Sequence, residues 1–245
     1  MSNSLALGYH ALSEDWPAAL STTPELFEHQ VRLLERRGYR GVTFTELVAG
    51  DRRSRGKLVA FTFDDAYSSV ARLAKPLLDR VGFPGTVFVP TDFPGRGEPM
   101  SWPGIDHWLE GPHEAELLPL SWAELRSLAD EGWEVGSHTC SHPRLTALGD
   151  SELEAELSVS RERCADAVGR DCRSIAYPYG DWDRRVSLAA ERAGYRAGAI
   201  LALSRVFQRS RPLEWPRVGV YRIDAGWRFR LKVSPALRTL RRDVF

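Results

Sequence analysis

The sequence lacks the features that identify several large classes of protein. Its formal net charge is zero, with 33 basic and 33 acidic side chains, so it has no basic surplus for binding nucleic acid. No apolar run approaches the length of a membrane-spanning helix, and the first residues show neither the cationic nor the apolar segment of a signal peptide. These absences argue against a nucleic-acid partner and predict a cytoplasmic protein.

Cysteine is also scarce. The three cysteines, Cys140, Cys164 and Cys172, are an odd number and show no paired spacing. A secreted fold held together by disulfides has a regular set of cysteine pairs. We therefore expect reduced thiols, which fits the cytoplasm.

The sequence does contain enough apolar material for a core, arranged in two alternating patterns. Hydrophobic residues make up 43% of its 245 residues, an ordinary share for a globular domain. Short runs rich in Val, Phe and Ile alternate with longer stretches of helical period, without an internal repeat or a low-complexity linker. This α/β pattern predicts one barrel of seven or eight β/α units, with a doubly wound open sheet as the alternative.

Local signals predict where the elements lie. Thr23 can cap a helix that begins at Pro24, and Ser121 with Glu124 gives a capping-box pattern before another helix. Further helices are predicted over 68–80, 151–168 and 184–193, and strands over 5–9, 41–44, 58–63, 85–89, 133–137, 174–177, 195–201 and 218–223. Residues 91–120 contain many Pro and Gly residues, and we expect an insertion over the active-site face there.

Three polar segments each follow a predicted strand: Thr62-Phe63-Asp64-Asp65, His138-Thr139-Cys140-Ser141-His142, and Tyr177-Pro178-Tyr179-Gly180. In a β/α barrel the carboxyl ends of the strands share one face, so distant segments converge there. The first segment alone could be a solvated turn in which Asp caps the next helix, and the third could be an ordinary turn, because Pro, Gly and Asp favour turns. Their common position at strand ends predicts a joint site instead.

The two histidines and the aspartate pair together suggest a metal centre. His138 and His142 are four residues apart, a spacing that places both imidazoles on one face of a helical turn; two structural histidines are the alternative. Two histidines and one carboxylate leave an open coordination position for water, as a catalytic zinc site requires. The metal would polarise a scissile amide, the second aspartate would take a proton from water, and a backbone N–H of the 178–180 turn would stabilise the oxyanion.

These segments, in this order, resemble those of the NodB-homology polysaccharide deacetylases, the fourth family of carbohydrate esterases. The resemblance runs from Gly8-Tyr9-His10 to about Arg222 and implies a single distorted (β/α)7-type barrel over residues 1–226. It implies that Asp64 is the general base, that Asp65, His138 and His142 bind the metal, and that the Tyr179 backbone N–H stabilises the oxyanion. The implied metal is zinc, with cobalt or nickel as alternatives.

The chain departs from the family pattern at two positions. Members often carry an Arg just before the Pro-Tyr turn, where this chain has Ala176; Arg217 could supply that guanidinium from the next strand, or it could be a surface residue. Many members also have a late His that protonates the leaving amine, but this chain has no His after His142. We expect His10, at the end of the first strand, to be the proton donor or a structural histidine of the pocket wall.

Residues 227–245 form a basic tail with interleaved apolar side chains. Such a segment can lie on an anionic membrane surface, or it can be a solvated final helix packed on the barrel. The tail therefore predicts either peripheral membrane contact or a structural role.

The predicted activity is metal-dependent removal of the N-acetyl group from an amino sugar, in a polysaccharide, an oligosaccharide, or a lipid- or nucleotide-linked sugar. Two alternatives remain open at this point: a deformylase or other linear amidase, and an inactive sugar-binding protein that retains the metal. The oligomeric state is not predicted.

Overall fold

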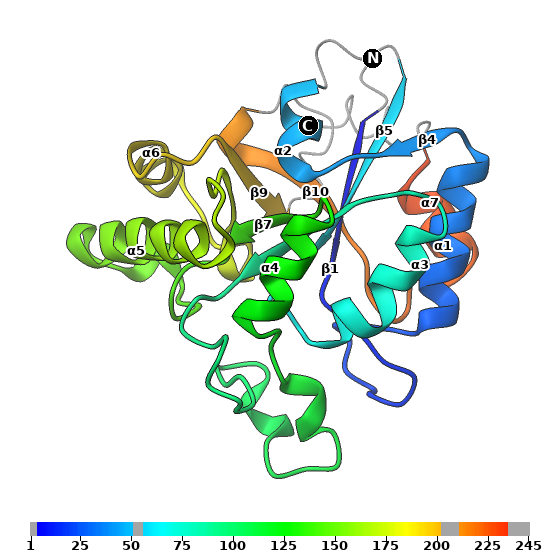
Figure 1. Cartoon of the computed structure of the whole chain (residues 1–245), viewed down its shortest axis with the longest axis horizontal. Helices are drawn as coiled ribbons and strands as arrows, with labels where there is room; N and C mark the ends of the chain where they lie inside the picture. Colours follow the sequence, from blue (N-terminus) through cyan, green and yellow to red (C-terminus); the bar gives the residue numbers. More distant parts are fainter. Residues whose placement is uncertain (1–3, 51–55, 202–210, 235–245) are drawn as a thin grey trace.

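A ring of parallel strands forms the centre of the molecule (Figure 1). The computed structural model describes residues 4–50, 56–201 and 211–234. Seven of the strands in these ranges form the ring in the order β1-β10-β9-β8-β7-β6-β5, and β1 also pairs with β5. The ring strands are β1 (Leu5–Tyr9), β5 (Lys57–Phe63), β6 (Gly85–Val89), β7 (Glu134–Ser137), β8 (Ser174–Ala176), β9 (Ala197–Leu201) and β10 (Trp215–Gly219). The β1–β5 pairing closes the sheet, so the predicted (β/α)7-type barrel is confirmed and the open sheet is wrong.

The remaining elements surround this ring. Strand β4 (Tyr39–Gly41) pairs with β5 outside the ring, and β2 (Ala11–Leu12) pairs with β3 (Ser21–Thr22). The α-helices of the described ranges are α1 (Pro24–Arg36), α2 (Phe44–Gly50), α3 (Lys75–Asp79), α4 (Trp122–Asp130), α5 (Asp150–Val168), α6 (Arg184–Arg192) and α7 (Trp227–Lys232), and a π-helical turn over Val70–Ala74 leads into α3. In the described ranges, no helix is both long and apolar enough to cross a membrane.

The predicted helix caps are present. The Thr23 side chain accepts a hydrogen bond from the Leu26 backbone at 3.2 Å at the start of α1. Ser121 and Glu124 form the reciprocal capping box of α4, with bonds of 3.2 and 2.8 Å. These side chains satisfy backbone N–H groups that a helix terminus otherwise leaves free, so short-range signals located both helix starts.

The last strand lies earlier than predicted. Val, Tyr and Ile favour a strand over 218–223, but β10 runs over Trp215–Gly219. Its first three residues pair with β9, and Val218 and Gly219 pair with β1. A turn follows, in which the Tyr221 backbone donates to the Asp224 carboxylate at 2.8 Å. Similarly, the strand predicted over 41–44 ends at Gly41, and Phe44 begins α2.

Small side chains leave room inside the barrel. Alternate residues of a strand face opposite sides of the sheet, and one buried cluster joins alternate positions of several ring strands to α2. Half of its members are alanines: Ala6, Ala60, Ala176, Ala197, Ala199, Val42, Phe44, Leu47, Leu58 and Phe88. The opposite strand faces join a larger cluster with the surrounding helices. In Figure 1, α2 lies at the top of the barrel and the irregular 91–120 segment at the bottom.

A candidate metal centre at the carboxyl ends of the strands

Three buried ligand-type side chains meet at one point. Asp65 follows β5, whereas His138 and His142 follow β7. The Asp65 Oδ1 atom lies 3.4 Å from the His138 Nε2 atom and 3.3 Å from the His142 Nε2 atom. One ligand atom from each residue falls within 4.8 Å of the others. The structure therefore brings together the three residues that the sequence suggested as metal ligands.

A loop, not a helical turn, places the two histidines. Residues 138–142 have no helical assignment, and Thr139 and His142 have φ values of 70° and 62°. The predicted helical turn is therefore wrong. Glu156 of α5 stabilises the loop by accepting hydrogen bonds from the Cys140 and Ser141 backbone N–H groups at 2.7 and 3.1 Å.

A backbone carbonyl orients His138. The Nδ1 atom of His138 lies 2.8 Å from the Ala176 carbonyl oxygen, which can only accept a hydrogen bond. The proton of the neutral ring is therefore on Nδ1, and the Nε2 lone pair faces Asp65. Metal-binding histidines commonly use this arrangement, because it fixes both the tautomer and the ring.

The chemistry and spacing of these three residues fit a divalent cation. In a tetrahedral site with ligand bonds of about 2.0–2.1 Å, neighbouring ligand atoms are roughly 3.3–3.4 Å apart, close to the separations observed here. The Asp65 Oδ1 atom is buried and has no hydrogen-bond partner among the described residues. Burial raises the pKa of Asp65, but the two neighbouring histidines outweigh that effect and lower the pKa well below its usual range, so the carboxyl stays ionised.

Asp64 forms a buried ion pair beside this centre. Arg217 donates to the Asp64 Oδ1 and Oδ2 atoms at 2.6 and 2.8 Å, and to the Thr62 hydroxyl at 2.7 Å. Burial raises the pKa of Asp64, but the charge and hydrogen bonds of Arg217 outweigh it, and the net pKa is lowered. Both residues are at most 2% exposed, so a solvated turn at Asp64 and a surface location for Arg217 are both wrong.

The interior of the barrel explains how Arg217 reaches Asp64. Gly8 pairs with Gly219 across β1 and β10, and a Cβ atom at Gly8 would lie 3.6 Å from the guanidinium carbon of Arg217. Position 176, where family members carry the arginine, is a buried alanine here. The space near Asp64 therefore accommodates a guanidinium that comes from β10.

Tyr179 and His10 lie near the same centre. Tyr179 has a φ of 58° in the turn after β8, and its ring centroid is 4.7 Å from that of His142. His10 follows β1, and its charge helps to lower the pKa values of both Asp64 and Asp65. The His10 Nδ1 atom is buried without a hydrogen-bond partner among the described residues.

The sequence did not single out three aromatic residues of the site. Trp102 stacks on His142, with ring centroids 4.1 Å apart and an interplanar angle of 22°. The buried Tyr67 ring lies close enough to Asp65 for the carboxylate to raise the Tyr67 pKa further, after burial as the main cause. The Asp64 carboxylate likewise raises the pKa of Tyr221, after burial as the main cause. None of these residues belongs to a spaced motif, so no sequence signal marked them.

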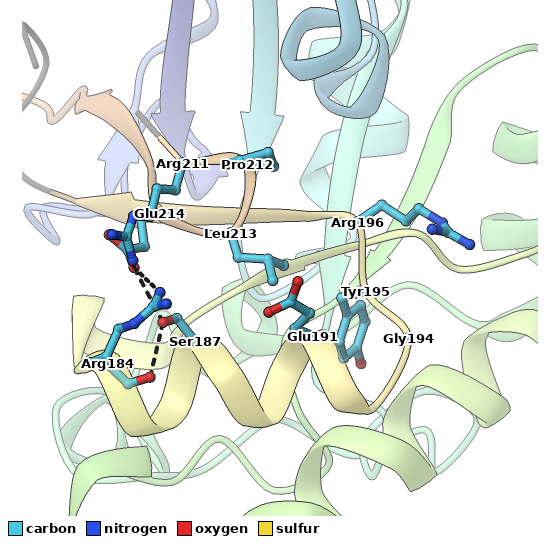
Figure 2. Close-up of a pocket in the computed structure, with 10 residues that line it drawn as sticks. All are labelled: Arg184, Ser187, Glu191, Gly194, Tyr195, Arg196, Arg211, Pro212, Leu213 and Glu214. Atoms are coloured by element: carbon cyan, nitrogen blue, oxygen red, sulfur yellow. Dashed lines mark hydrogen bonds and ion pairs between the residues drawn. The ribbon is translucent and has the colours of Figure 1, made fainter. Parts of the chain in front are cut away.

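A groove of about 540 Å³ lies away from the metal centre (Figure 2). It is bordered by α6 and by the residues that precede β9 and β10, at the amino ends of these strands. Arg184 and Arg211 there pair with Glu214 at 3.2 and 4.0 Å. Barrel active sites lie at the carboxyl ends of the strands, where the metal ligands are. The groove lies at the opposite end of the barrel and is therefore not part of the candidate metal centre.

Comparison with known proteins identifies the family. The family model described as polysaccharide deacetylase matches residues 51–198. The YxkH protein of Bacillus subtilis (strain 168) is 26% identical over 195 residues, which cover 78% of this chain and 62% of YxkH. A chitooligosaccharide deacetylase of Bradyrhizobium sp. (strain ANU 289) is 32% identical over 103 residues, or 40% of this chain and 42% of that protein. The chain thus spans less than two thirds of the length of either relative.

Solved structures share the fold. The Streptococcus pyogenes deacetylase PplD in complex with acetate has a TM-score of 0.75 at 20% identity, over 94% of this chain and 98% of PplD. IcaB from Ammonifex degensii has a TM-score of 0.74 at 23% identity, over 95% of this chain and 97% of IcaB. At such identities the likeness shows a common barrel. Because the family model covers more than half of the sequence, the chain belongs to the polysaccharide deacetylase family.

Proposed function

We propose that the protein is a metal-dependent hydrolase that removes an N-acyl group, most simply acetyl, from an amino sugar of a glycan or a carrier-linked sugar. Membership of the polysaccharide deacetylase family supports the reaction class. The observation that carries the proposal is Asp64, an ionised and buried carboxylate directly beside the cluster of Asp65, His138 and His142. Metal binding alone would not require a second buried carboxylate, which costs free energy to desolvate.

The cation would be held by Asp65, His138 and His142, and zinc suits two imidazoles and one carboxylate best; cobalt or nickel are the alternatives. When bound, it would supply Lewis-acid activation of water and of the amide carbonyl. Asp64 accepts the proton of the attacking water. Arg217 holds the Asp64 carboxylate in place through two hydrogen bonds, so its ionised form is ready at neutral pH.

Two further groups complete the proposed reaction. The Tyr179 backbone N–H would donate to the oxyanion that develops on the carbonyl oxygen; the packing of the Tyr179 ring against His142 supports a location of this turn beside the metal centre. The departing nitrogen needs a proton, and His10 would provide it. The position of His10 directly after β1, on the face where the parallel strands end, supports that assignment.

Release of acetate from N-acetylated chitooligosaccharides, measured with and without a chelator, tests the proposal. Asp64→Asn should reduce turnover by at least ~10²-fold, the effect expected for loss of a general base, while the zinc content stays the same. Asp79→Asn is a matched control, because this half-exposed carboxylate on α3 pairs with Lys75 rather than with a residue of the metal centre. Full activity of the Asp64→Asn variant would refute the proposed role of this carboxylate.

The same assay separates the rival functions. Formate release from N-formylated sugars, without acetate release from N-acetylated ones, would replace the proposal by a deformylase. Zinc binding with sugar affinity but no released acid would favour an inactive binding protein. His10→Ala should lower turnover without loss of zinc, and unchanged turnover would remove His10 from the mechanism.

We also propose that the segment beginning at Trp227 contacts an anionic membrane surface. Ile223, Trp227 and Leu231 are 65%, 68% and 48% exposed, and Arg228 and Arg230 lie among them on α7. Exposed apolar side chains next to basic ones favour the interface of an anionic bilayer. Residues 235–245, the rest of the predicted tail, lie outside the described residues.

Co-sedimentation with vesicles tests this contact. Binding should be stronger to vesicles that contain phosphatidylserine than to pure phosphatidylcholine, and Trp227→Ser should weaken it. Failure of the intact protein to bind either vesicle would refute the membrane proposal. A cytoplasmic location remains part of the proposal and is supported by three buried cysteines without disulfides.

A further inference from the structure

The two histidines of the metal centre are supported differently. His138 is fixed by its Nδ1 contact with the Ala176 carbonyl at 2.8 Å. The Nδ1 atom of His142 is buried and has no hydrogen-bond partner among the described residues. A ligating imidazole normally uses this second nitrogen to fix its ring, so the orientation of His142 must be set by other contacts.

Ring packing supplies those contacts. The indole of Trp102 stacks on the His142 imidazole at a centroid separation of 4.1 Å and an angle of 22°. The Tyr179 ring meets the same imidazole edge-on, at 4.7 Å and 67°. Rotation about the last torsion of a histidine side chain is only weakly restricted by its own covalent structure. A face-to-face indole restricts it, because a rotated imidazole would collide with the stacked ring.

Trp102 is itself firmly supported. It is 7% exposed, and its ring packs edge-on against Phe93 at 5.2 Å. Its backbone carbonyl accepts hydrogen bonds from the Ile105 and Asp106 N–H groups at 3.1 and 3.2 Å. The indole can therefore act as a fixed wall.

The 91–120 segment that carries Trp102 is attached to both metal-binding loops. At one end, the Thr91 backbone N–H donates to the Thr139 carbonyl at 3.0 Å. At the other, the Leu120 N–H donates to the Ala66 carbonyl at 2.8 Å, and the Ser68 N–H donates to Leu118 at 2.8 Å. These bonds fix the segment relative to the residues that surround the cation site.

We propose that Trp102 is a positioning residue that holds the His142 imidazole with Nε2 toward the metal. Trp102 orients His142 by stacking on its ring, whereas the Ala176 carbonyl orients His138 by accepting a hydrogen bond. The inference rests on the proposed metal site and extends it to the 91–120 segment, which supports a ligand in addition to covering the barrel end. Loss of the indole should therefore weaken the metal site rather than the fold alone.

Zinc affinity of the metal-stripped protein, measured by competition with a chromophoric chelator, tests the role. Trp102→Leu should weaken zinc binding about 10–100-fold, the range for loss of a group that orients a ligand. Trp102→Phe keeps an aromatic face and should restore most of the affinity. Trp108→Leu is the matched control: it makes the same change in the same segment, and the rings that Trp108 contacts are those of Trp16, His107 and His113.

The outcomes are distinct. Wild-type zinc affinity in Trp102→Leu, or equal weakening in Trp108→Leu, would overturn the positioning role. Failure of the wild-type protein to bind zinc would instead overturn the proposed metal site. A measurement on the unaltered, metal-free protein avoids any folding defect: stacking predicts upfield ring-current shifts for the His142 ring protons in its NMR spectrum. Shifts typical of an unstacked histidine would contradict the inference.

Discussion

Replacement of Arg217 by methionine should destabilise the protein strongly, because it leaves a charged carboxylate buried without its partner. The paired side chains of Arg217 and Asp64 are 0% and 3% exposed, and two hydrogen bonds join them. Removal of one member of such a pair costs about 3–5 kcal/mol. In a chain of this size, that corresponds to a decrease of roughly 6–20 °C in the unfolding midpoint.

The same change should alter the pH dependence of turnover. Burial is the largest single effect on the pKa of Asp64 and raises it. The charge of Arg217 and its hydrogen bonds, together with nearby histidines, lower the pKa by more in total. Without the guanidinium the pKa of Asp64 rises. The base is then protonated at a higher pH, so the acid limb of the rate profile should move to higher pH. An acid limb that stays in place would contradict the assignment of Asp64 as the base.

A double-mutant cycle separates the pair from general packing effects. Thermal unfolding is measured for Arg217→Met, Asp64→Asn and the double variant, at the same zinc concentration. The double variant buries no unpaired charge, so it should be less destabilised than the sum of the single variants. Arg163→Met, which removes an exposed ion pair with Asp92, is the control and should cost at most about 1 kcal/mol. Additive effects in the cycle would refute the argument.

Three further predictions concern the metal site and the barrel. Burial lowers the pKa of His138, but the effects of Asp65 and Asp64 are larger, and the net pKa is raised. Because a protonated imidazole cannot bind metal, zinc affinity should fall as the pH decreases through that raised pKa. Competition titration measures this affinity, and a constant value would contradict the prediction. Glu156→Gln weakens the support of the histidine loop and should reduce zinc affinity about 10-fold or more, without loss of helix content by circular dichroism. Gly85→Ala places a Cβ atom 2.3 Å from the Trp133 ring, and calorimetry should show a stability loss of about 1–3 kcal/mol.

Local sequence was sufficient for several elements and for the set of ligand residues. Helices α1 and α4 begin where Thr23 and Ser121 predict, because a cap is a contact between residues three positions apart. Short apolar runs predicted the bounds of β1, β5 and β6 to within one residue. The aspartate pair and the two histidines could be recognised because each group lies within a few residues of the chain. Their convergence followed from the rule that parallel strands end on one face.

Only the tertiary structure decided the features that depend on contacts between distant residues. Strand β10 starts at Trp215 because its partners on β9 and β1 set its register, which overrides the β propensity of 218–223. Arg217 is paired with Asp64 because alanines and glycines of other strands leave space for it in the barrel. Trp102 lies on His142 through a stacking contact across 40 positions of sequence. Sequence patterns encode local hydrogen bonding and periodicity, whereas register, burial and ring stacking are set by which surfaces meet after folding.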